Sequence, residues 1–208
     1  MSDPDQTNYA GGRDADWQRY SKPITKIGII GHGEHGKDVF ANHLAKHAKL
    51  RYIAGTSVYA ADIVFHKLRR KFAYAREYPN ATACWLDRRN HREDWAEAIG
   101  EHNAVDPVQL YRDCLTFQDL LTGLRWRHEF LACREAGLVD LWVFVHREGQ
   151  PSDDTCEIRP GDCDWQIPNN GTLDELEAHA KWLAKWIEAT NHQTTTATLH
   201  ATPDRPMT

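Results

Sequence analysis

A strand, a glycine loop and a helix follow one another without interruption near the start of this 208-residue chain. The β-branched run ITKIGII at residues 24–30 leads into GHGEHGKD at residues 31–38, and apolar side chains then recur at helical spacing through residues 39–48. In such a unit the loop leaves the carboxyl end of a buried strand and opens directly into the helix. This arrangement predicts a parallel sheet, and it constrains the fold more than any other stretch of the sequence.

The rest of the chain alternates between strand and helix signals. Further strands are predicted at residues 51–55, 117–123, 138–146 and 162–169. Helices are predicted at residues 56–75, 87–102, 106–115, 125–137 and 172–189. The strand at 138–146, LVDLWVFVH, is apolar on both faces, as a central parallel strand should be. The alternation predicts an α/β fold with ligands at the carboxyl ends of the strands.

One compact domain is expected at residues 23–189, because a chain of this length can bury a core without disulfides. Residues 1–22 are polar and rich in glycine and aspartate, and residues 190–208 are rich in threonine, so both are expected to be flexible tails. The five cysteines are odd in number and lack C-x-x-C spacing, which favours reduced, mostly buried thiols.

Neither a membrane span nor a secretion signal is evident. The longest purely apolar run, LWVFV at residues 141–145, is far shorter than the roughly 18 residues of a membrane helix. The chain also lacks a basic start followed by an apolar stretch. We therefore expect a cytoplasmic protein without a membrane partner.

Charge is distributed unevenly over the chain, whose net charge is −5. Residues 66–92 hold eight lysines and arginines against Glu77 and Asp87, a local charge of +6, while the remainder holds 17 basic and 28 acidic residues. Two interpretations remain open, a solvated helix face and a surface for one polyanionic ligand. The acidic remainder excludes a protein that coats DNA nonspecifically.

Two phosphate-binding signatures overlap in the glycine loop. Gly31, Gly33 and Gly36 satisfy the G-x-G-x-x-G of a dinucleotide-binding turn, while Gly31, Gly36 and Lys37 satisfy the G-x-x-x-x-G-K of a P-loop. A dinucleotide site needs an acid about 20 residues further on, or an arginine for NADP, and that region offers only Arg51.

Lys37 favours the P-loop, because its ammonium at the start of the helix can reach the β- and γ-phosphates. Asp38 stands where a P-loop usually has Ser or Thr. Its carboxylate could coordinate Mg²⁺, accept a proton from the attacking group, or serve as a helix-start acid. The predicted fold is therefore a three-layer sandwich of the P-loop NTPase type.

Several motifs together give the chain a family resemblance. The G-K-D ending of the loop, TGLRWRHE at residues 122–129, the hydrophobic strand leading into Arg147, and DWQIPNNGTLDEL at residues 164–176 resemble the bacteriophage P-loop deoxynucleotide kinases. That group includes deoxynucleoside monophosphate kinases and DNA kinases that phosphorylate 5-hydroxymethyluridine within phage DNA. The resemblance covers about residues 24–187.

The resemblance implies a site for ATP and Mg²⁺ along the loop. The implied ATP-binding residues are Gly31, His32, Gly33, Glu34, His35, Gly36, Lys37 and Asp38. Asp38 is the expected metal ligand, Asn169 is expected near the adenine, and Arg147 is expected to close over the phosphates.

The acceptor is expected to be held by arginines, since phosphoryl transfer needs positive charge around the moving group. Arg125 and Arg127 follow a strand end through Gly123, and Asp119 upstream is the candidate for orienting or deprotonating the acceptor. A second set is Arg88, Arg89 and Arg92. Arg88 and Arg92 share a predicted helix face with Trp95, which is itself more typical of a core residue.

The leading functional hypothesis is an ATP-dependent kinase acting on a pyrimidine deoxynucleotide. The acceptor is either the hydroxymethyl group of 5-hydroxymethyluridine in phage DNA, on the way to hypermodified thymidine, or a free deoxynucleoside monophosphate. More distant alternatives are an NADP-dependent oxidoreductase and a nucleotide-binding module without catalysis. A homodimer is left open as the oligomeric state.

Overall fold

Strand β1 (Ile27–Ile30) lies in the middle of the sheet and carries the glycine loop at its carboxyl end. The computed structural model describes residues 20–152 and 155–200, and within them the sheet has four strands in the order β2-β1-β3-β4. The other strands are β2 (Leu120–Thr122), β3 (Leu141–His146) and β4 (Trp165–Pro168). Every pairing is parallel, which confirms the predicted α/β class.

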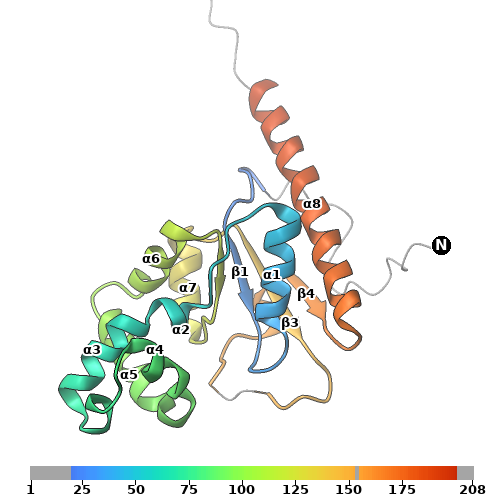
Figure 1. Ribbon diagram of the computed structural model, residues 1–208. Helices are drawn as coiled ribbons and strands as arrows, with labels where there is room; N and C mark the ends of the chain where they lie inside the picture. Colours follow the sequence, from blue (N-terminus) through green and yellow to red (C-terminus); the bar gives the residue numbers. More distant parts are fainter. Residues whose placement is uncertain (1–19, 153–154, 201–208) are drawn as a thin grey trace, which may run out of the picture.

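Helices cover both faces of this sheet (Figure 1). The α-helices are α1 (Lys37–Ala48), α2 (Thr56–Tyr59), α3 (Ala61–Lys71), α4 (Ala81–Leu86), α5 (Arg92–His102), α6 (Gln109–Phe117), α7 (Arg127–Glu135) and α8 (Leu173–His200). Short 3-10 helices are η3 (Tyr74–Arg76), η4 (Arg88–His91) and η5 (Pro160–Asp162). Helices α1 and α8 pack on one face and α6 and α7 on the other, while α3, α4 and α5 form a helical lobe to one side. The three layers are consistent with a sandwich of the P-loop type.

The two faces of the sheet are built by alternation along the strands. In β3, Leu141, Val143 and Val145 belong to the core under α1 and α8, whereas Trp142 and Phe144 belong to the core on the opposite face. All five side chains are buried, because a parallel strand between two helical layers has no solvent-facing side. This explains why the strand reads as an unbroken apolar run.

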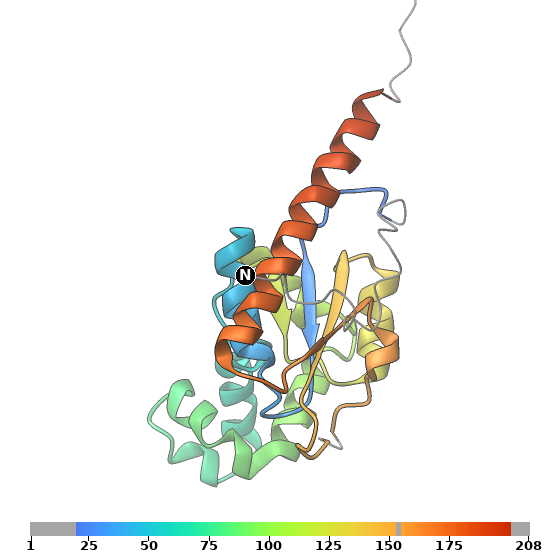
Figure 2. The ribbon, with the colours of Figure 1, turned by 90° about the vertical axis from the view of Figure 1, so that its right-hand side faces the viewer.

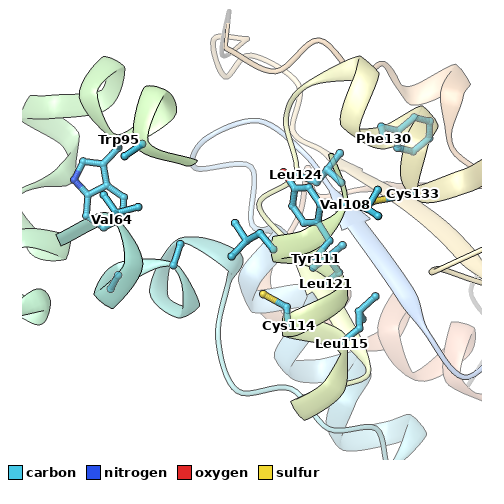
Figure 3. Packing of buried hydrophobic residues seen from close by; sticks show 14 of the residues in the cluster. Val64, Trp95, Val108, Tyr111, Cys114, Leu115, Leu121, Leu124, Phe130 and Cys133 are labelled. Carbon is cyan, nitrogen blue, oxygen red and sulfur yellow. The ribbon is translucent and has the colours of Figure 1, made fainter. Parts of the chain in front are cut away.

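The core on the α6 and α7 face continues into the helical lobe (Figure 3). Tyr111 from α6, Leu121 from β2 and Phe130 from α7 pack near the sheet, and Val64 from α3 and Trp95 from α5 extend the cluster outward. Trp95 is only 5% exposed, which confirms the interpretation of this residue as core. The five cysteines are free thiols and three of them are buried, as expected.

Residues 51–55 were predicted to form a strand, and that prediction is wrong. The segment runs beside the sheet without strand pairing, because the Gln118 side chain takes up its backbone groups. The Gln118 amide accepts from the backbone N–H groups of Ile53 and Ala54 and donates to the Ala54 carbonyl at 3.1 Å. A buried side-chain amide therefore makes the hydrogen bonds to these backbone N–H and C=O groups that a neighbouring strand would otherwise make.

Some predicted helix boundaries also need correction. The helix expected at residues 56–75 divides at Ala60 into α2 and α3, and it ends at Lys71. The helix expected at residues 87–102 begins as the 3-10 helix η4, so Arg88 does not share an α-helical face with Trp95.

The domain extends beyond the limits expected from composition. Helix α8 continues through the threonine-rich segment to His200 and projects past the sheet (Figure 2). At the other end, the ring of Tyr20 packs edge-on against Trp186, and Lys22 Nζ lies 2.7 Å from a carboxylate oxygen of Asp140. Residues 1–19 and 201–208 lie outside the described residues.

None of the helices in the described part of the chain is both long and apolar enough to cross a membrane.

Gly28 is predicted to be essential for the packing of β1. A Cβ added to Gly28 would lie 2.3 Å from the ring atoms Cε3 and Cζ3 of Trp142, whose side chain is buried. We expect Gly28→Ala to lower the free energy of unfolding by about 2 kcal/mol through overpacking. Gly100→Ala is the matched control, because nothing lies within 4 Å of its added Cβ and alanine favours the helix by up to about 1 kcal/mol. Urea unfolding of both variants measures the difference, and equal effects would contradict the prediction.

Candidate functional site

The loop between β1 and α1 has the backbone geometry of a phosphate cradle. Gly36 caps α1 with a φ of +88°, and Glu34 adopts a φ of +65° two residues earlier. Lys37 then opens the helix, its side chain only 13% exposed and its Nζ 3.3 Å from Asp38 Oδ2. Free N–H groups at a helix N-terminus next to a lysine form a binding site for phosphate oxygens.

Two side chains fix this loop from behind. His35 is buried, and its Nδ1 accepts from the backbone N–H of Arg147 at 3.0 Å while its Nε2 lies 3.3 Å from the Pro151 carbonyl. Burial lowers the pKa of His35, so the neutral ring with its proton on Nε2 suits both partners. The Asn169 amide donates to the His35 carbonyl at 3.0 Å, and a Cβ on Gly36 would meet that amide at 2.3 Å.

These contacts change the interpretation of two expected ATP ligands. The His35 ring and the Asn169 amide are both used inside the protein, where they connect the loop to the ends of β3 and β4. Contact of Asn169 with adenine stays a prediction. Arg147 is exposed and follows β3 at the same edge of the sheet, as its proposed role requires.

Asp38 is held by two hydroxyl groups that the sequence analysis missed. Its Oδ1 accepts from Thr122 Oγ1 at 3.0 Å and from the Tyr52 hydroxyl at 3.2 Å, and the two hydroxyls lie 3.0 Å apart. Burial raises the pKa of Tyr52, which keeps its hydroxyl protonated. Thr122 ends β2 and is fully buried, whereas the Asp38 side chain is 55% exposed. The position of Thr122 at a strand end is the sequence signal that could have identified it.

Arginines from two segments gather near this carboxylate. Burial lowers the pKa of Arg88, the guanidinium groups of Arg89, Arg125 and Arg92 lower it further, and the charge of Asp38 raises it. Three of the other four predicted substrate arginines therefore lie within electrostatic reach of Arg88. Crowding of like charges is unfavourable without an anion between them, so the arrangement favours an anionic ligand.

Arg88 is held rigidly within this group. Its guanidinium stacks 4.2 Å above the ring of Trp85 and donates to the Trp85 carbonyl at 3.0 Å, and the Trp85 indole N–H donates to Ser57 Oγ at 3.2 Å. Arg89 reaches the loop itself, with its Nη1 3.6 Å from Glu34 Oε1. Arg89 thus joins the helical lobe to the glycine loop.

Asp119 was predicted to act on the acceptor, and the structure contradicts that role. It precedes β2, and its backbone carbonyl accepts from Ile27 at the start of β1, at the opposite edge of the sheet from the loop. Its carboxylate lies 2.8 Å from Lys26 Nζ and 2.8 Å from Arg51 Nη2. The hydrogen bond with Arg51 and, to a smaller extent, that with Lys26 hold the pKa of Asp119 well below its usual range. Asp119 is a structural ion-pair residue.

Arg127 is also separated from the expected substrate group. Its guanidinium lies 2.7 Å from Asp162 Oδ2, and its backbone N–H donates to Glu157 Oε2 at 2.9 Å. It secures the start of α7 to the segment before β4. Arg125 instead donates to Thr155 Oγ1 and remains near Arg88.

The donor set at Asp38 fits a magnesium ion. Carboxylate and hydroxyl oxygens are the hard ligands that Mg²⁺ prefers, and Mg²⁺ commonly takes its remaining ligands from phosphates and water. Among the described residues, no group of three or more His, Cys, Asp or Glu side chains is placed to hold a metal by itself. A cation here would therefore be held jointly with a bound nucleotide.

Comparison with known proteins gives a distant likeness only. A scan against protein-family models finds no match, and neither does a search of the curated proteins. Among solved structures, the chain is similar to an unliganded sugar kinase from Janibacter sp. HTCC2649, with 12% sequence identity, 82% of this chain and 98% of that chain covered, and a TM-score of 0.44. A likeness at this level identifies neither a substrate nor a reaction.

Asp119→Asn is predicted to affect stability rather than activity. Because the folded-state pKa of Asp119 is lowered, its ion pairs stabilise the fold fully above the unfolded pKa of about 4, and this stabilisation is lost as pH falls toward the folded-state pKa. We expect the variant to lose about 1–2 kcal/mol of unfolding free energy at pH 7 and much less near pH 2.

Urea unfolding between pH 2 and pH 7 measures that difference, with Glu135→Gln as a control at an exposed carboxylate of α7. If the site catalyses phosphotransfer, as proposed below, the folded Asp119→Asn variant should match the native rate. A kcat reduced by about a hundredfold at full folding would restore Asp119 as a general base.

Proposed function

We propose that this protein is an ATP-dependent kinase that transfers the γ-phosphoryl group to a pyrimidine deoxynucleotide. The observation that supports it best is the placement of Lys37 and Asp38 at the N-terminus of α1, facing Arg88 and its neighbouring arginines. Anion-binding backbone, a lysine, a carboxylate and several guanidinium groups thus converge at one edge of a parallel sheet. This is the edge where α/β proteins bind ligands.

Each part of the site has a role in phosphoryl transfer. The loop N–H groups and Lys37 bind the β- and γ-phosphates, which fixes the phosphorus for in-line attack by the acceptor oxygen. Arg88 and Arg125 come from different segments and stabilise the charge that spreads over the transferred group. Mg²⁺ bound beside Asp38 would neutralise charge on the phosphate oxygens. Catalysis of this kind depends on positioning and charge more than on a strong base.

We propose 5-hydroxymethyluridine within DNA as the acceptor, with a free deoxynucleoside monophosphate as the alternative. The support is the number of cations in and beside the helical lobe, which exceeds what one monophosphate requires. Lys67 and Lys71 pair with Glu97 and Glu101 and contribute little net charge. The exposed cations that could follow a DNA backbone are Arg69, Arg70, Arg76, Arg89 and Arg92.

The dinucleotide alternative loses its supporting residue. An NADP site would use Arg51 for the 2′-phosphate, yet Arg51 donates through its backbone and through two guanidinium nitrogens to Asp119. These groups lie at the amino ends of the strands, away from the glycine loop. A nucleotide-binding module without catalysis is separated from a kinase by the experiments below.

The acceptor is tested by transfer of labelled γ-phosphate from ATP with Mg²⁺. The acceptors, assayed in parallel, are duplex DNA with 5-hydroxymethyluridine, the same duplex with thymidine, and the free deoxynucleoside monophosphates. Label in the modified duplex alone supports the DNA acceptor, and label in a monophosphate supports the alternative. Binding of ATP with no label in any acceptor would favour the module.

Lys37→Ala is predicted to abolish phosphotransfer. Loss of the ammonium that binds the transferring phosphoryl should lower kcat/KM by at least about a thousandfold with little change in unfolding free energy. Lys181→Ala, at an exposed lysine of α8, is the control and should leave kcat/KM unchanged. Native activity in folded Lys37→Ala would exclude the P-loop mechanism.

A further inference from the structure

The hydroxyl and the carboxylate at this site occupy unusual positions. In P-loop NTPases, Mg²⁺ is held by a Ser or Thr hydroxyl that follows the loop lysine and by an Asp carboxylate that belongs to the Walker B segment. Here the carboxylate, Asp38, follows Lys37, and the hydroxyl, Thr122, ends the strand paired with β1. The two groups still face each other, with Thr122 Oγ1 donating to Asp38 Oδ1 at 3.0 Å.

The Thr122 hydroxyl is closely surrounded by its neighbours. Thr122 is fully buried, and a Cβ on Gly55 would lie 3.0 Å from Thr122 Oγ1 and 3.6 Å from Asp38 Oδ1. Tyr52 closes the third side, with its hydroxyl 3.0 Å from Thr122 Oγ1. Such close enclosure by Tyr52 and Gly55 keeps the Thr122 hydroxyl directed at the carboxylate.

We propose that Asp38 and Thr122 hold the divalent cation of the nucleotide with their chemical roles exchanged relative to the usual P-loop pair, and that Tyr52 is a positioning residue for both. The proposal rests on the proposed function, because the cation is the one that accompanies ATP. The exchange conserves what Mg²⁺ requires, since the pair still supplies one anionic and one neutral oxygen. It also explains why a loop ending in G-K-D binds a nucleotide without Ser or Thr.

The direct test reverses the exchange. In Asp38→Ser combined with Thr122→Asp, the hydroxyl returns to the loop and the carboxylate to the strand end. Titration calorimetry with the non-hydrolysable analogue AMP-PNP gives its dissociation constant with and without Mg²⁺. The constant without Mg²⁺ divided by the constant with Mg²⁺ is the ratio that measures the cation's contribution, and it does not depend on turnover. The single variant Asp38→Ser and the native protein are measured in parallel.

We expect Asp38→Ser to reduce the ratio by about tenfold or more and the double variant to recover it to within about threefold of the native value. Without Mg²⁺, both variants should bind AMP-PNP at least as tightly as the native protein does, because Lys37 and the loop are intact; this binding also verifies their folding. A native ratio in Asp38→Ser, or no recovery in a double variant that binds AMP-PNP without Mg²⁺, would overturn the exchange.

Thr122→Val provides a second measurement that does not depend on a buried carboxylate. It removes the hydroxyl at nearly constant volume and should lower the ratio by about tenfold, and Tyr52→Phe should lower it less. Thr116→Val, at an exposed threonine of α6, is the matched control and should keep the native ratio. A native ratio in Thr122→Val would overturn the proposal, whatever the rate at which this variant hydrolyses ATP. Failure of the native protein to bind AMP-PNP at all would instead remove the proposed function together with this inference.

Discussion

Parallel pairing of β1 with both β2 and β3 determines where the chemistry of this protein can lie. Gly28 pairs with Leu121 on one side and with Trp142 on the other, so the carboxyl ends of the three strands meet at one edge. The glycine loop and Arg147 follow directly from β1 and β3, and Thr122 is the last residue of β2. Close approach of Trp142 to Gly28 keeps this pairing tight, and a displaced β1 would separate the loop from its partners.

The long excursion between β1 and β2 brings the cations to that edge. It contains the helical lobe, and it returns to the sheet through the buried Gln118 amide and the ion pairs of Asp119 with Lys26 and Arg51. These contacts lie at the amino ends of the strands, opposite the loop. The contacts that stabilise the fold thus lie at one edge of the sheet, and the proposed ligand site lies at the opposite edge. Asp119 belongs to the stabilising contacts.

The sequence predicts the elements of the site better than its contacts. Strands β1 and β3 could be read from apolar runs, and the loop from its glycines and Lys37, because these patterns reflect local geometry. The prediction for Asp119 placed it at the wrong edge because β2 has only three residues. Residues at the two ends of so short a strand are close in sequence, and the sequence does not say which edge of the sheet each side chain reaches.

Long-range partners account for the other differences. The ion pair of Arg127 with Asp162 spans 35 residues, and the contact of Asn169 with the loop spans 134. Thr122 escaped notice because a threonine at a strand end is typical of strands in general. Its significance depends on Asp38, 84 residues away.

Asp38 also links the cations of the site to the binding of a ligand. Lys37 Nζ lies 3.3 Å from Asp38, and the Arg88 charge interacts with the same carboxylate, so Asp38 is a counter-ion to both. A nucleotide polyphosphate would take over these cations and leave the carboxylate beside negative oxygens. That arrangement is unfavourable unless a cation joins it. Nucleotide and Mg²⁺ are therefore expected to bind with positive coupling, and Asp38 is the group through which the coupling acts.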